Sequence, residues 1–362
     1  MRAFRIDANL DCEATWAGAP LPAAVRAKLA GLATLVRAVV PDGATALVDL
    51  PPGFDRGRIA DPDGAPPWRP RTAADDAHPR LAWGADDVAA PAGPAAASAA
   101  WRDRLAAIAP PAIATVRPLA DRRWSLALGQ RLGAALSGAQ PATSVAEVEA
   151  AIAGSALRAA SGQHAWIAKA AISAAGRDRV RRRGPLDDAT RTRLMRLAAR
   201  GGLVVEPWVE RLVDVGQPGL IDDEVTLLPA HRLLTDPGGG FVGIAIAADP
   251  ARLGLTADEH AELRAVAAAV GAALAAGGYR GAFTVDAFAW RDPAGVRRFH
   301  ALCEVNPRLT FGLVARAWSE RVGGDLTLHL GSAIPAGATA LLHPAPGDPT
   351  SAWLAGTPTA PG

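Results

Sequence analysis

Four polar residues near the end of one predicted hairpin carry the clearest chemistry in the sequence. Asp286 lies in the first strand, and Glu304, Asn306 and Arg308 follow at two-residue intervals toward the end of the second. Carboxylate and amide oxygens are the ligands that Mg²⁺ prefers, with phosphate oxygens completing the site. An arginine beyond them can stabilise charge on a transferred phosphoryl group. We expect Asp286, Glu304 and Asn306 to bind metal and Arg308 to be catalytic; the alternative is a solvated acidic sheet face.

Two strands must place these side chains on one face. Apolar residues alternate with other residues over 283–290 and again over 299–305, on either side of a turn at 291–295 that contains Pro293 and Gly295. Period two indicates strands, and the Pro and Gly indicate the turn. Asp286 and Glu304 should therefore project from the same face. They need not be directly opposite, because diagonal neighbours about 7 to 8 Å apart can also share metal ions.

Lysine is almost absent from a strongly arginine-rich chain. Of 38 basic residues only Lys28 and Lys169 are lysine. Lys28 belongs to an amphipathic helical pattern and is expected on a solvated face. Lys169 lies within the strand-like run HAWIAKAAI, where a charge is costly without a partner. A compact ammonium kept at this position indicates a specific anionic partner.

A loop of small and basic residues follows that strand at residues 173–179. Ser173 and Gly176 belong to it, and small side chains let backbone amides approach a phosphate closely. Read alone, it is an ordinary hairpin loop. The basic run at 177–183 could also bind nucleic acid, but it has no interleaved aromatic residues.

An extended segment at residues 206–209 follows the strand that begins near Leu203. Pro207 holds Glu206 extended, and such a segment exposes the backbone groups that recognise a planar base. The alternative is an inter-domain linker with a buried Trp208. Glu206 and Asp214 would then be ordinary surface charges.

Composition bounds the remaining possibilities. The chain has 362 residues, half of them hydrophobic, and a formal net charge of +2, so a globular protein of two to three domains is expected and a nucleic-acid or membrane surface is not. Two cysteines cannot form a disulfide framework. No signal peptide or membrane-spanning run is predicted, which indicates a cytoplasmic protein.

The order of elements suggests four parts. We expect an N-terminal α/β domain over 1–120, a central subdomain over 121–205, a C-terminal subdomain over 206–330 and a loosely ordered tail over 331–362. Residues 109–116 are expected to be a linker entering a strand. Capping-box spacings predict that helices begin after Ser144 and Thr256.

The segments at 165–179, 203–214 and 281–312 together resemble the ATP-grasp superfamily, and their motif order is similar to that of biotin carboxylase and D-alanine-D-alanine ligase. The most specific part is VDAF followed by CEVNPRLTFG, since the family carries an acid on one strand and E-x-N-x-R at the end of the next. The resemblance implies an α+β, ATP-grasp fold, in which an N-terminal α/β domain precedes two α+β subdomains that enclose the nucleotide.

The resemblance also assigns the nucleotide contacts. Lys169 would bind phosphate, Ser173 and Gly176 would belong to the phosphate loop, and Asp214 would hold the ribose hydroxyls. The hinge that contacts adenine would contain Glu206, Trp208 and Val209. Many members carry a second phosphate-binding lysine after an Asp at the entrance to the central subdomain. Here Asp121 is followed by Arg122 and Arg123, so Arg122 is the expected phosphate contact and Arg123 the alternative.

By the same resemblance the chain would be an ATP-dependent ligase that uses ATP with Mg²⁺, or Mn²⁺ in its place. It would convert a small-molecule or peptide carboxylate to an acyl phosphate and join it to an amine acceptor, releasing ADP and phosphate. No nucleic-acid or membrane partner is expected, and a homodimer is compatible with the resemblance. The alternative is a nucleotide-binding regulatory or partner protein without turnover.

Overall fold

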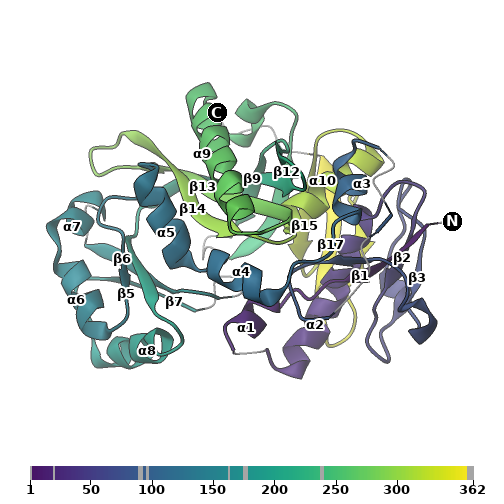
Figure 1. The fold of residues 1–362 in the computed structure, drawn as a ribbon, viewed down its shortest axis with the longest axis horizontal. Helices are drawn as coiled ribbons and strands as arrows, with labels where there is room; N and C mark the ends of the chain where they lie inside the picture. Colours follow the sequence, from purple (N-terminus) through teal and green to yellow (C-terminus); the bar gives the residue numbers. More distant parts are fainter. Residues whose placement is uncertain are drawn as a thin grey trace.

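The computed structural model describes residues 2–18, 21–88, 93–94, 98–161, 164–173, 178–236 and 240–356. Within these ranges the strands form three sheets, which follow one another along the long axis of the molecule (Figure 1). The N-terminal sheet lies at one end, a small sheet with its helices lies at the other, and the large sheet lies between them.

The N-terminal sheet is parallel. It contains β1 (Ala3–Asp7), β2 (Thr45–Val48), β3 (Trp68–Pro70) and β4 (Arg80–Ala82) in the order β3-β2-β1-β4. Its helices are α1 (Cys12–Trp16), α2 (Ala23–Ala33) and α3 (Trp101–Ala106). Parallel strands joined through helices are the arrangement of an α/β domain.

Helix α4 (Ile113–Leu119) corrects one prediction, because residues 109–116 were expected to lead into a strand. Val116 and Leu119 are both buried and lie three residues apart, on one side of the helix. Burial of that side stabilises a helix that the local Pro-rich sequence did not indicate. Helix α5 (Arg122–Arg131) then begins at Asp121, whose side chain accepts a hydrogen bond from the Arg123 amide.

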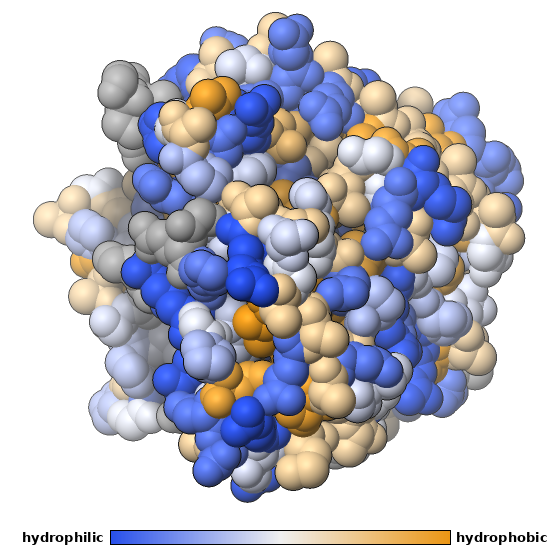
Figure 2. All heavy atoms as spheres, turned by 90° about the vertical axis from the view of Figure 1, so that its left-hand side faces the viewer, coloured by the Kyte–Doolittle hydropathy of each residue, from blue (hydrophilic) through white to orange (hydrophobic). Residues whose placement is uncertain are grey.

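The small sheet is antiparallel, with β5 (Gln140–Ala142), β6 (Ala165–Ala170), β7 (Arg179–Arg183) and β8 (Leu203–Pro207) in the order β5-β8-β6-β7. The helices α6 (Val145–Ala153), α7 (Ser155–Ser161) and α8 (Asp188–Ala198) pack against it. The predicted start of α6 is confirmed, since Ser144 Oγ accepts from the Glu147 amide at 3.2 Å. The molecular face at this end mixes hydrophilic and mildly apolar residues (Figure 2).

The large sheet contains the predicted hairpin. Its strands are β9 (Glu210–Ile221), β10 (Val225–Leu227), β11 (His231–Thr235), β12 (Phe241–Ile246), β13 (Gly281–Arg291), β14 (Arg297–Asn306), β15 (Leu326–Gly331), β16 (Thr339–Leu342) and β17 (Ser351–Gly356). The order is β14-β13-β9-β11-β12-β15-β17-β16, with β10 beside β9. Helix α9 (Ala257–Ala276) begins at the predicted capping box of Thr256 and Glu259.

The C-terminal part is more ordered than the sequence indicated. We expected residues 331–362 to be a loosely ordered tail, yet β16 and β17 continue the large sheet from β15. Leu341, Leu342 and Ala352 are buried there. A few apolar residues among Gly, Pro and Thr form a strand pair once a sheet edge is present to receive them.

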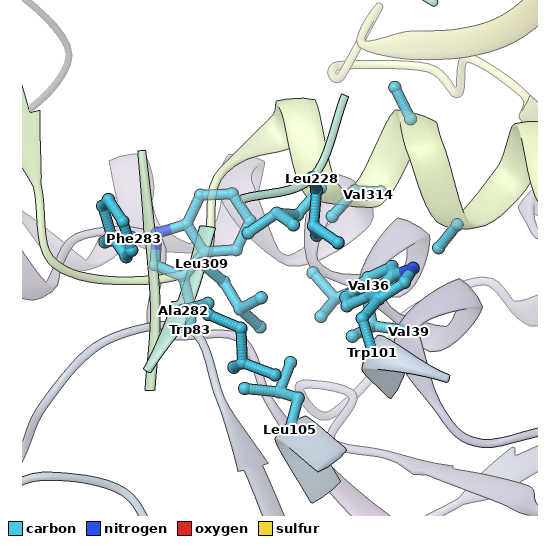
Figure 3. Close-up of a cluster of buried hydrophobic side chains, with 14 of the residues drawn as sticks. Val36, Val39, Trp83, Trp101, Leu105, Leu228, Ala282, Phe283, Leu309 and Val314 are labelled. Atoms are coloured by element: carbon cyan, nitrogen blue, oxygen red, sulfur yellow. The ribbon is translucent and has the colours of Figure 1, made fainter. Parts of the chain in front are cut away.

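The N-terminal domain shares its hydrophobic core with the large sheet. Helix α10 (Phe311–Val322) packs between them, and Val314 lies among side chains of both parts (Figure 3). Trp83 from the end of β4 and Leu309 before α10 belong to the same cluster. The boundaries at 120, 205 and 330 remain our proposal. In the described ranges no helix is both long and apolar enough to cross a membrane.

Candidate nucleotide and metal site

The hairpin cluster, which we define as Asp286, Glu304, Asn306 and Arg308, lies at the end of β13 and β14. Asp286 pairs directly with Glu304 in the strand register, and Thr284 pairs with Asn306. Asn306 Nδ2 donates to Asp286 Oδ2 at 2.9 Å. Burial raises the pKa of Asp286 to about 7, and the neighbouring Glu304 adds to that rise. The two carboxylates therefore repel each other unless a cation or proton lies between them.

The donor set of this cluster fits Mg²⁺. It offers two opposed carboxylates and one amide oxygen, which is the hard oxygen chemistry that this ion takes. Among the described residues no three His, Cys, Asp or Glu side chains converge as a cation site. An ion held here would need further oxygens from solvent or from phosphates.

Arg308 is fixed at the outer end of the cluster. Its Nη2 donates to Asn306 Oδ1 at 3.0 Å, and its Nη1 donates to the Leu309 carbonyl at 2.9 Å. Nη2 also lies 3.0 Å from Glu13 Oε1 in α1. Burial lowers the pKa of Arg308, while its surroundings, chiefly Glu13, raise it, with a net rise, so the guanidinium stays charged.

Gly216 and His231 are the next cross-strand neighbours of Asp286 in the large sheet. Gly216 on β9 pairs with Asp286 on one side and with His231 on the other. The His231 ring fills the space left by Gly216, and a Cβ at Gly216 or at Gly312 would overlap it. The ring is 1% exposed, and burial lowers its pKa to about 3, so it is neutral.

Lys169 projects from the small sheet toward the large one. Its Nζ lies 2.6 Å from Glu206 Oε2 on β8 and 3.9 Å from Cys303 Sγ on β14. Burial lowers the pKa of Lys169, but the charges around it, among them the Glu206 carboxylate, raise it, with a net rise. Burial raises and Lys169 lowers the pKa of Glu206, with a net lowering. The predicted need for an anionic partner is thus met within the protein.

Arg122 also connects the small sheet to the hairpin cluster. Its Nη2 lies 2.5 Å from Glu304 Oε1, while its Nη1 donates to the Ala170 carbonyl and to Ser173 Oγ at 2.7 and 2.8 Å. Burial lowers and Glu304 raises the pKa of Arg122, with a net rise. Arg123 instead pairs with Asp121, so of the two arginines it is Arg122 that reaches the site.

The connection between β8 and β9 links the small sheet to the large one. The side chain of Val209 is buried, and the Trp208 amide donates to the Ala165 carbonyl at 2.9 Å. Arg181 lies 4.6 Å from the centre of the Trp208 ring. Residues 206–209 therefore run from the end of β8 to the start of β9 and connect the two sheets, and their role as a hinge stays a prediction.

Arg211 and Asp214 follow on β9 and face the same region. Arg211 Nη1 lies 2.6 Å from Asp214 Oδ1, and its guanidinium lies 3.9 Å from the centre of the Phe288 ring. Asp214, predicted to hold ribose, therefore has an arginine partner in this structure. Gly176 and residues 174–177 lie outside the described residues, so the predicted phosphate loop is described only at Ser173 and from 178 onward.

Several neighbours of the site did not emerge from the sequence. Glu13 and Trp83 come from the N-terminal domain and contact Arg308, and Arg211 contacts Phe288. No spacing rule links these pairs, because each contact joins separate elements of the fold. The one available signal was that Glu13 follows Asp7 and Asp11 in an acidic stretch after the first strand.

Comparison with known proteins gives the fold. No family model and no curated protein matches the sequence. The structure is similar to N5-carboxyaminoimidazole synthetase from Staphylococcus aureus complexed with ADP, with a TM-score of 0.52, 12% identity, and coverage of 91% of this chain and 82% of that chain.

Two further solved structures show weaker similarity. Biotin carboxylase from Campylobacter jejuni, in a complex with an ATP ligand, has a TM-score of 0.49 and 12% identity over 94% of this chain and 78% of that one. N5-carboxyaminoimidazole ribonucleotide synthetase from Thermus thermophilus has a TM-score of 0.48 and 14% identity over 94% and 88%.

Proposed function

We propose that this chain, which has the ATP-grasp fold, is an ATP-dependent ligase that activates a carboxylate as an acyl phosphate and joins it to an amine. The observation that carries the proposal is the convergence of two sheets on one place. Lys169 reaches from β6 of the small sheet to Cys303 of the hairpin, and Arg122 at the start of α5 reaches Glu304 while it also contacts the end of β6. Phosphate-binding cations and metal-binding oxygens are thereby brought together, as the site of a nucleoside triphosphate requires.

Each side chain has a role in this proposal. Lys169 and Arg122 neutralise phosphate charge, and the backbone of residues 206–209 binds the adenine edge. Asp286, Glu304 and Asn306 would hold Mg²⁺, which when bound would supply positive charge to the phosphates. When Lys169 contacts phosphate it stays close to Glu206, because the buried Glu206 carboxylate needs a cation nearby.

The proposed reaction has two steps. A carboxylate oxygen attacks the γ-phosphorus, the bond to the bridging oxygen breaks, and ADP leaves. The amine nitrogen then attacks the acyl carbon, loses a proton to solvent, and phosphate leaves as the amide forms. Arg308 stabilises the charge that develops on the phosphoryl group and on the tetrahedral intermediate. Positioning and charge account for most of such catalysis, so no protein nucleophile is required.

Hydroxylamine trapping tests this function. Purified protein is incubated with ATP, Mg²⁺, hydroxylamine and a library of carboxylates, and both ADP and hydroxamate are measured. We expect both products with at least one acid for the wild type and neither for Lys169→Ala or Glu304→Ala. Tight ATP binding without ADP formation for every acid would contradict the ligase and support a nucleotide-binding protein without turnover.

A further inference from the structure

The N-terminal domain contacts the hairpin cluster at Arg308. Two of its side chains meet the guanidinium: Glu13 from α1 through an ion pair of 3.0 Å, and Trp83 through its ring, whose centre lies 5.6 Å away. The Arg308 and Glu13 side chains are 14% and 12% exposed, so water screens this pair weakly. A weakly screened pair with a fixed partner ring holds a guanidinium in one orientation.

Glu13 is the last member of a continuous polar chain that begins at the predicted metal ligands. Asn306 donates to Asp286 at 2.9 Å, and Arg308 donates to Asn306 at 3.0 Å and to Glu13 at 3.0 Å. The ion pair of Arg104 with Asp222 also joins the N-terminal domain to the large sheet, but its other partners, Thr226 and Glu224, are not residues of the hairpin cluster. The Glu13 contact is therefore tied to the hairpin cluster, whereas Arg104 with Asp222 only joins two parts of the fold.

The two N-terminal residues are held rigidly with respect to each other. Gly84 follows Trp83, and its amide donates to Asn9 Oδ1 at 3.1 Å while its carbonyl accepts from Asn9 Nδ2. A Cβ at Gly84 would overlap Cys12, so the segment after β4 packs directly against α1. Glu13 and Trp83 thus belong to one packed unit.

This unit is also fixed to the segment that carries Arg308. The Leu309 amide donates to the Trp83 carbonyl at 2.8 Å, and both side chains belong to the core shared by the N-terminal domain and the large sheet (Figure 3). The buried Nε of Arg308 has no hydrogen-bond partner among the described residues. The contacts of Nη1 and Nη2 therefore hold the guanidinium, and its Nε–H takes no part in them.

We propose that Glu13 is a positioning residue for Arg308: with Trp83 it holds the guanidinium in place beside Asp286 and Asn306, so that the N-terminal domain completes the reactive end of the site. The inference rests on the proposed function for the catalytic role of Arg308, but the contact itself does not depend on turnover. Glu13 acts through Arg308 and does not take part in bond changes.

The first test reads the contact directly and needs no activity. The side-chain ¹⁵N signals of Arg308 are assigned by their loss in Arg308→Lys. We expect two separate Nη signals in the wild type, because rotation about the Cζ–Nε bond is restricted, and their merging in Glu13→Gln. Asp11→Asn is the matched control: it removes an acid two residues away whose side chain makes no cap contact, and it should leave the signals separate.

The second test measures turnover with the acid found by hydroxylamine trapping. We expect Glu13→Gln to lower kcat about tenfold while KM for ATP stays within about twofold, and Glu13→Asp to restore part of the loss. In an Arg308→Lys background Glu13→Gln should lower kcat no further, because the effects of changing residues that act as one unit are not additive. Asp11→Asn should turn over like the wild type.

The outcomes separate the two proposals. Unchanged Arg308 signals or unchanged kcat in Glu13→Gln would overturn the positioning role, and so would additive losses in the double variant. A lower KM for the carboxylate in Glu13→Gln would also overturn it, since Glu13 would then compete with substrate for Arg308. A third outcome is that the Arg308 signals merge in Glu13→Gln but the wild type turns over no acid. That result would support the contact and overturn the ligase.

Discussion

Lys169 on β6 and Glu206 on β8 form a buried ion pair across adjacent strands, with 2.6 Å between Nζ and Oε2. The pair lies where the small sheet faces Cys303 of the large sheet. Each charge offsets part of the cost of burying the other. Changing one partner must therefore affect both the stability of the protein and its affinity for any anion that binds Lys169.

Lys169→Ala tests both effects. We expect ATP affinity to fall on the order of 100-fold and the free energy of unfolding to fall by about 3–5 kcal/mol, because Glu206 is left buried without a cation. Lys169→Met with Glu206→Gln should recover most of the stability but none of the affinity. Calorimetric ATP titration and urea unfolding measure the two quantities. The control is Lys28→Met, the other lysine; wild-type ATP affinity in the double variant would refute the phosphate role.

If Asp286 binds Mg²⁺ as proposed, metal binding should depend on pH. Its pKa of about 7, raised by burial, means that a proton occupies the carboxylate below neutral pH and competes with Mg²⁺. Apparent Mg²⁺ affinity in the presence of ATP should rise about tenfold per unit up to pH 7 and then level off. Calorimetry at pH 6, 7 and 8 measures this.

Two variants serve as references for the Asp286 titration. Asp286→Asn should bind Mg²⁺ weakly and without the pH dependence. Asp292→Asn, in the turn of the same hairpin, should retain the wild-type curve. If the wild-type affinity for Mg²⁺ does not change between pH 6 and 7, then Mg²⁺ does not compete with a proton on Asp286.

The ion pair between Arg104 on α3 and Asp222 after β9 joins the N-terminal domain to the large sheet. Two hydrogen bonds of 2.7 Å from Arg104 lower the pKa of Asp222 to about 2. A carboxyl with a lowered folded-state pKa stabilises the fold above its ordinary value near 3.8, and this contribution is lost as pH falls toward 2.

Asp222→Asn should therefore lower the free energy of unfolding by roughly 2 kcal/mol at pH 7, and the difference from wild type should shrink between pH 4 and pH 2. Urea unfolding at pH 7, 4 and 3 follows the change. Glu224→Gln is the matched control, since Glu224 is 77% exposed and 3.8 Å from Arg104. An equal loss at every pH would mean that the pair does not titrate as described.

Position 312 at the start of α10 must be glycine because the His231 ring occupies the space that a Cβ would take. Gly312→Ala should destabilise the protein by about 1–3 kcal/mol, because the new Cβ overlaps the ring in a closed space. His231→Ala should relieve that overlap, so the double variant should lose less than the sum of the single changes. Gly356→Ala, where no atom lies nearby, is the control. Thermal unfolding compares these variants with the wild type, and additive losses would disprove the overlap.

Local patterns predicted the elements that carry their own signals. The alternation around Asp286 and Glu304 gave the β13–β14 hairpin, and the capping residues Ser144 and Thr256 gave two helix starts. The sequence did not predict α4 or the strands β16 and β17, because their stability comes from burial against distant parts of the chain.

The candidate site divides in the same way. Lys169 and the hairpin cluster were found because an unusual residue or a fixed spacing marks them. Glu13, Trp83 and Arg211 were not, since their contacts exist only after separate domains or strands meet. Long-range pairs of this kind leave no periodic pattern in one sequence. The roles of the predicted site residues stay predictions until the variants are measured.

The scarcity of lysine has a chemical consequence. Only Lys28 and Lys169 carry side-chain amines, and Lys169 is 9% exposed and bound to Glu206. An acylating reagent should therefore modify Lys169 only when the small sheet opens away from the large one. Mass spectrometry of that single peptide would then record how often the two sheets separate. Because the composition is rich in arginine and poor in lysine, the buried amine of Lys169 would be a built-in label for the opening of the molecule.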